Sequence, residues 1–152
     1  MLGLRLLFLG CVLTICFCKT ADVWVTLSVC VDANANFGYG NTTKSQFPYR
    51  LAAIYTTLLW KKVSDYNVLV FLITDRPDSY GPLVQALVEA GAKVVIHSTV
   101  KHFSCPTTAQ LMRVMAFQQT HLIKPTDIII TADADAFPKS AGITAPLRNS
   151  DS

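Results

Sequence analysis

Apolar and polar positions follow one another along this chain in blocks that predict alternating strands and helices. Short, almost continuously apolar runs rich in β-branched residues occur at 24–31, 67–74, 92–97 and 128–130. Such runs are typical of strands buried on both faces of a parallel sheet. Between them, apolar residues recur every three or four positions, which predicts helices at about 45–63, 81–90 and 107–122.

The helical spacing also predicts which side chains face the sheet. They are Leu51, Ile54, Tyr55, Leu58 and Leu59 in the first helix, Leu83, Val84, Leu87 and Val88 in the second, and Leu111, Val114, Met115 and Leu122 in the third. Gly91 is placed to end the second helix as a C′ glycine. Strands alternating with helices predict an α/β domain with a mostly parallel, Rossmann-like sheet and helices on both faces.

The most informative polar residues of the chain follow the fourth predicted strand. The run Ile128–Ile130 is followed by Asp133-Ala134-Asp135. Positions i and i+2 of an extended segment point to the same side, so we expect the two carboxylates to converge. Close carboxylates repel one another unless a cation lies between them, and carboxylate oxygens suit Mg²⁺ or Mn²⁺. The alternative is a pair of solvated loop aspartates.

Composition excludes some classes of protein. Apolar residues make up 51% of the 152 residues and charged residues 15%, which excludes a disordered chain. The net charge of +3 is small and scattered, and we therefore expect no nucleic-acid partner.

The N-terminal segment 1–18 differs from the rest of the chain. A short basic start precedes a 13-residue apolar run, Leu6–Cys18, which is the length of a signal-peptide core. A signal anchor is the alternative, and only that would make the membrane a partner. Either predicts entry into the secretory pathway, as a Golgi, ER-lumenal or secreted protein. The α/β domain then covers 22–138, and 139–152 is a tail without a convincing element.

Outside that segment, the cysteines are Cys30 and Cys105. They either form a disulfide in an oxidising lumen or stay free, with Cys30 a core residue of the first strand. A glycosylation sequon begins at Asn41, in a polar loop, and we expect partial or no occupancy there because the loop is expected to face a ligand.

These features together resemble the GT-A fold of nucleotide-sugar-dependent glycosyltransferases. The run from Gln110 to Phe117, followed by an apolar strand and Asp133-Ala-Asp135, is similar to the glycogenin-type pattern of a basic residue and an aromatic on the helix before Asp-Ala-Asp. The resemblance covers about 23–138. It implies a nucleotide-diphospho-sugar as ligand, a UDP-sugar being favoured, and a sugar or protein acceptor.

The resemblance also implies roles for single residues. Asp135 would bind the divalent cation, and Asp133 the same cation or the ribose. Asp32 and Tyr39 follow the first strand, where the family holds the base and ribose. Two further assignments are Asp75 to a uracil N–H and Arg113 to a phosphate. Each also has a plain alternative: Tyr39 as a surface turn aromatic, Asp75 as a turn residue before Pro77, and Arg113 as a solvated helix arginine.

Two other function classes compete with this interpretation. A haloacid-dehalogenase-like phosphatase also has Asp-x-Asp after an apolar strand, but its motif lies near its start, whereas 132 residues precede Asp133 here. The other class is a non-catalytic secreted α/β module or an inactive truncated product. Because only 17 residues follow Asp135, we expect an incomplete GT-A fold that does not transfer sugar by itself. The resemblance assigns no catalytic base.

Overall fold

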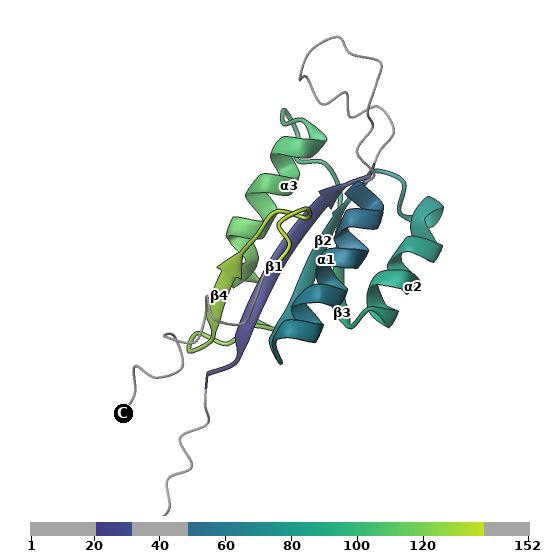
Figure 1. Cartoon of the computed structure of the whole chain (residues 1–152). Helices are drawn as coiled ribbons and strands as arrows, with labels where there is room; N and C mark the ends of the chain where they lie inside the picture. Colours follow the sequence, from purple (N-terminus) through teal and green to yellow (C-terminus); the bar gives the residue numbers. More distant parts are fainter. Residues whose placement is uncertain (1–20, 32–48, 139–152) are drawn as a thin grey trace, which may run out of the picture.

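The computed structural model describes residues 21–31 and 49–138, which form a four-stranded parallel sheet with helices on both faces (Figure 1). The elements along the chain are β1 (Val23–Cys30), α1 (Tyr49–Val63), β2 (Asn67–Ile73), η1 (Pro77–Tyr80), α2 (Gly81–Glu89), β3 (Ala92–His97), α3 (Cys105–Val114), η2 (Met115–Gln118) and β4 (Ile128–Thr131). The strand order is β3-β2-β1-β4. The α/β class predicted from the sequence is confirmed.

Alternate residues of the central strands divide the core between the two faces. Val25, Leu27 and Val29 of β1 pack with residues of α1 and α2, whereas Trp24 and Cys30 pack on the side of α3. The pleat sends successive side chains to opposite faces, and all eight residues of β1 are buried. The sheet therefore has one core under α1 and α2 and another under α3.

The helices bury a partly different set of side chains from those predicted, although Ile54, Leu83 and Val84 pack against the core as expected. In α1 the buried residues are Ala52, Ala53, Thr56, Thr57 and Trp60, while Leu51, Tyr55 and Leu58 are exposed. In α3 the buried residues are Thr108, Ala109 and Met112, while Leu111 and Val114 are exposed. In α2, Leu87 is buried as expected and Val88 is exposed. Small side chains let a helix backbone approach the sheet closely. When apolar residues occupy more than one face of a helix, this close approach decides which face packs on the sheet.

The third helix also ends earlier than predicted. Regular α-helix stops at Val114 and continues as the 3₁₀ segment η2 to Gln118, whereas the spacing predicted helix to residue 122. At the end of α2 the prediction holds, because Gly91 has a φ of +97° and follows the capping residue Ala90. Its N–H donates to Val88 O at 2.9 Å, which closes the helix end.

Strand β4 is less buried than expected. Ile128, Ile129 and Ile130 are half-buried and Thr131 is exposed. The reason is its position: β4 pairs with β1 along one side, and no strand of the described residues pairs with its other side. Ile128 and Ile130 still pack against the core under α1 and Ile129 against the core under α3, so β4 is covered on both faces but less completely than the expected fully buried strand.

Candidate functional site

Polar residues of the candidate site follow the carboxyl ends of the strands. α1 and α2 cover one face of the sheet and α3 covers the other (Figure 1). The helix that follows β1 and the helix that precedes the neighbouring strand β4 therefore lie on opposite faces, which makes the position between β1 and β4 a topological switch point. In open α/β sheets such a switch point is where ligands bind. Register places Thr131, the last residue of β4, opposite Thr26, so β1 runs on past β4 by four residues, about 13 Å.

The Asp-Ala-Asp motif lies at this step in the sheet, in a turn. β4 ends at Thr131, and the Ala136 N–H donates to the Asp133 carbonyl at 3.0 Å, which closes a turn over 133–136. Ala134 is buried against the core under α1, whereas Asp133 and Asp135 are exposed on either side of it. The expectation that the motif continues as an extended segment is therefore wrong, because the backbone turns after Ala132.

Helix α1 holds this turn from one face. The hydroxyl of Thr56, which is fully buried, donates to Ala134 O at 2.6 Å. A buried carbonyl without a partner is costly, so this hydrogen bond fixes where the middle of the motif sits. Thr56 was not singled out in the sequence, where it appears as one of two adjacent threonines inside an otherwise apolar helix.

Helix α3 holds the turn from the other face. Arg113 donates through Nη1 to Ala132 O at 3.3 Å and forms an ion pair with the Asp133 carboxylate. The carbonyl of Arg113 in turn accepts from the hydroxyl of Thr26, which is buried in β1, at 3.1 Å. Arg113 and Asp133, both predicted as site residues, are thus brought together. The guanidinium is mostly covered, with 18% of its side chain exposed against 63% for Asp133.

The carboxylates of Asp133 and Asp135 supply oxygen ligands of the kind that divalent cations prefer. Mg²⁺ is commonly bound through one or two carboxylates, with water and substrate phosphates completing its shell. Asp135 is exposed at the turn, and Asp133 reaches the same turn with its charge offset by Arg113, which lowers the repulsion between the two. Within the described ranges there is no cluster of three or more Asp, Glu, His or Cys suited to a metal. The donor set therefore fits Mg²⁺ or Mn²⁺ bound jointly with a phosphate ligand.

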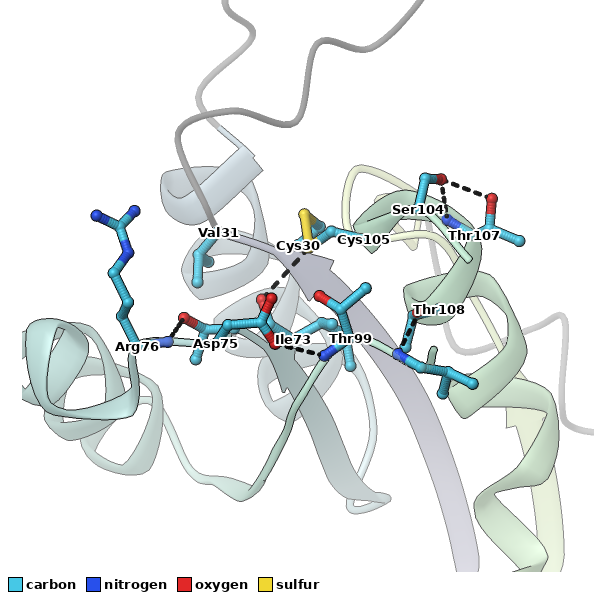
Figure 2. The surroundings of a disulfide bond; sticks show 12 residues. Cys30, Val31, Ile73, Asp75, Arg76, Thr99, Ser104, Cys105, Thr107 and Thr108 are labelled. Carbon is cyan, nitrogen blue, oxygen red and sulfur yellow. Dashed lines mark hydrogen bonds between the residues drawn. A yellow bond between two sulfur atoms is a disulfide. The ribbon is translucent and has the colours of Figure 1, made fainter. Parts of the chain in front are cut away.

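Asp75 takes part in a loop contact at the end of β2. Its Oδ1 accepts from the Thr99 N–H at 2.9 Å, so the carboxylate joins the segment after β2 to the segment after β3 (Figure 2). Asp75 is exposed. This contact between two loops belongs to neither interpretation of Asp75, the uracil contact or the turn before Pro77.

A disulfide links the same edge of the sheet to α3. Cys30, the last residue of β1, is bonded to Cys105, the first residue of α3, with their Cα atoms 5.6 Å apart (Figure 2). Of the two alternatives left by the sequence, the structure has the bridge. It fastens the start of α3, whose other end carries Arg113, to the central strand.

A second basic residue, also not singled out in the sequence, lies at the end of β1. Arg50, in the first turn of α1, donates through Nη2 to Val31 O at 2.6 Å. The same carbonyl accepts from the Tyr80 hydroxyl at 2.7 Å, and the Arg50 guanidinium carbon lies 4.9 Å from the centre of the Tyr80 ring. The arginine is therefore held by a carbonyl and a ring face, neither of which carries a net charge.

Three predicted residues, Asp32, Tyr39 and Asn41, lie outside the described residues, as do the N-terminal segment 1–18 and the tail 139–152. An open hollow of about 440 Å³ lies against the edge strand β3, lined among others by Val88, Gly91 and His121. It lies away from both aspartates of the motif and contains none of the predicted site residues.

Comparisons of the chain with protein-family models, with curated proteins and with solved structures yield no match. Among the described residues, no helix is both long and apolar enough to span a membrane.

Proposed function

We propose that this chain binds a nucleotide-diphospho-sugar together with Mn²⁺ or Mg²⁺, as a metal-dependent glycosyltransferase or the nucleotide-binding part of one. The observation that carries the proposal is the Asp133–Ala136 turn at the switch point of a parallel sheet, held by Thr56 from one face and by Arg113 from the other. Two carboxylates of one turn, at the place where such sheets bind ligands, fit recognition of a metal–diphosphate pair.

The residues of the turn differ in role. Asp135 would be the principal metal ligand. Asp133, already paired with Arg113, would either share the cation or accept a hydrogen bond from the ribose. When bound, the cation would neutralise the diphosphate and favour its departure from the sugar. The UDP-sugar remains the favoured donor by resemblance, and the acceptor would be a sugar or a protein.

The disulfide supports the proposed cellular compartment. Disulfides form and persist mainly in oxidising environments, and the cysteines of β1 and α3 are bridged here. This fits entry into the secretory pathway through the apolar N-terminal segment, where Golgi and ER glycosyltransferases act on their substrates.

The test is calorimetric titration of the chain, produced in a secretory host, with UDP in Mn²⁺ and again after chelation. We expect binding that is lost on chelation, and lost in Asp135→Ala more completely than in Asp75→Ala. Asp75 is the matched control because it is an exposed aspartate at the same edge, with its own loop contact. UDP binding that is unaffected by chelation, or unchanged in Asp135→Ala, would refute the proposal.

A further inference from the structure

The groups assigned so far leave the proposed site, with its ligand bound, with an excess of negative charge. The carboxylates of Asp133 and Asp135 and the two phosphates of the ligand carry more negative charge than one divalent cation and Arg113 supply. Arg113 is also committed to the Asp133 carboxylate and to Ala132 O, so it is poorly placed to reach a phosphate as well. A second cation near the switch point would complete the site.

Arg50 is placed to be that cation. It lies six residues before Thr56 on the same helix, hence about 9 Å along the axis from the residue that contacts the motif. Its partner Val31 directly follows β1, one of the two strands that flank the switch point. Among the described residues, Arg76 and Lys101 also lie at this edge, but they follow β2 and β3, which are further from β4 in the strand order.

Within the described part of the chain, the contacts of Arg50 fix its guanidinium without neutralising it. The Val31 carbonyl accepts from one of its nitrogens and the Tyr80 ring lies beneath the group, while the Tyr80 hydroxyl holds the same carbonyl. A guanidinium has five N–H donors in a fixed fork and binds phosphate with two at once. Arg50 is exposed, so the donors that Val31 does not use can face a ligand.

We propose that Arg50 binds a phosphate of the nucleoside diphosphate, on the β1 side of the switch point, opposite the metal-binding turn of β4. This rests on the proposed function of the Asp133–Ala136 turn. Tyr80 acts as a positioning residue, since it contacts the guanidinium and the carbonyl that holds it. The ligand would therefore lie between the end of β1 and the turn after β4.

The experiment measures the affinity for UDP in Mn²⁺ for the whole chain and for the variants Arg50→Gln, Arg50→Lys and Arg76→Gln, with melting temperatures recorded for each. Arg50→Gln should weaken UDP binding by about 10-fold or more, because a hydrogen bond to a charged group is lost. Arg50→Lys should recover part of the loss through its charge. Arg76→Gln is the matched control, because it removes an arginine that follows β2, further from β4 in the strand order, and its UDP affinity should stay within about 3-fold of the wild type.

The outcomes separate the two proposals. If the wild type shows metal-dependent UDP binding and Arg50→Gln binds equally well, the phosphate role of Arg50 is refuted and the proposed function stands. If Arg76→Gln loses as much affinity as Arg50→Gln, the loss comes from the positive charge of this edge in general, and the phosphate role of Arg50 is again refuted. If the wild type shows no metal-dependent UDP binding, the proposed function fails and the role of Arg50 fails with it.

Discussion

A single carboxylate, Asp127, joins the starts of the two strands that flank the switch point. It accepts hydrogen bonds from the Asp22 N–H at 3.2 Å, from Trp24 Nε1 at 3.1 Å and from the Lys124 N–H at 2.9 Å. Partial burial raises the pKa of Asp127, but the hydrogen bonds from Lys124, Asp22 and Trp24, with the Lys124 charge, outweigh it and lower the pKa below its usual 3.8.

This shift predicts how stability depends on pH. Because the folded-state pKa is lowered, the contribution of Asp127 is fully present above the ordinary value of 3.8 and is lost as the pH falls through the folded value. We expect Asp127→Asn to be less stable than the wild type near neutral pH and the difference to shrink in acid. Urea unfolding of both proteins from about pH 6 down to about pH 3 checks this. A difference that stays constant over that range would contradict it.

The two glycines at the ends of α2 should respond differently to replacement by alanine. Gly91 has a positive φ of +97°, and a Cβ there would lie 3.3 Å from Lys61 Cγ. Gly91→Ala should therefore cost about 1–2 kcal/mol of unfolding free energy. Gly81 is helical, and a Cβ there would meet no atom within 4 Å, so Gly81→Ala should be neutral or stabilise by about 0.5–1 kcal/mol. Thermal or urea unfolding of the pair measures both, and equal effects would contradict the assignment.

At the scale of the element, α1 holds the motif through a hydrogen bond. Two neighbouring threonines allow the effect of that hydrogen bond to be measured separately from the effect of the helix. Thr56 donates to Ala134 O in the turn, whereas Thr57 donates to Ala53 O within its own helix at 2.8 Å, and both are fully buried. Thr56→Val should leave the turn carbonyl unpaired, cost about 1–3 kcal/mol and weaken metal-dependent UDP binding. Thr57→Val should leave that binding near the wild-type level.

Melting curves and UDP titrations of the two variants check this prediction. Equal loss of UDP affinity in Thr56→Val and Thr57→Val would show that the effect comes from α1 as a whole. In that case the hydrogen bond to Ala134 would have no specific part in holding the motif.

The strands could be predicted from the sequence because their apolar runs are short, β-branched and bounded by polar residues. The packed faces of α1 and α3 could not, because both helices have large apolar residues on one face and Ala or Thr on another. Hydrophobicity alone favours Leu51 and Tyr55, whereas close packing on a sheet selects Ala53 and Thr56. The hydrogen bond from α1 to the motif could not be predicted for the same reason, since Thr56 belongs to the face that was predicted to be outside.

At the scale of the whole molecule, the alternation of elements predicted the parallel α/β class but not the position of β1 between β2 and β4. That position, with the change of face between β1 and β4, places the Asp133–Ala136 turn beside β1, which continues four residues beyond the last residue of β4. The sequence did predict Arg113, Asp133 and Asp135 as candidates. It could not predict that Arg113 pairs with Asp133, because their 20-residue separation is closed only by α3 packing on the sheet beside β4.

The central claim is that the cation and the nucleotide bind at one site, and it is tested most directly by linkage between them. Mn²⁺ affinity of the wild-type chain, measured by electron paramagnetic resonance of the free ion, should rise when UDP is present. The UDP affinity measured by calorimetry should rise with Mn²⁺ by the same factor, because binding free energies are coupled reciprocally. Mn²⁺ affinity that is identical with and without UDP would contradict the account.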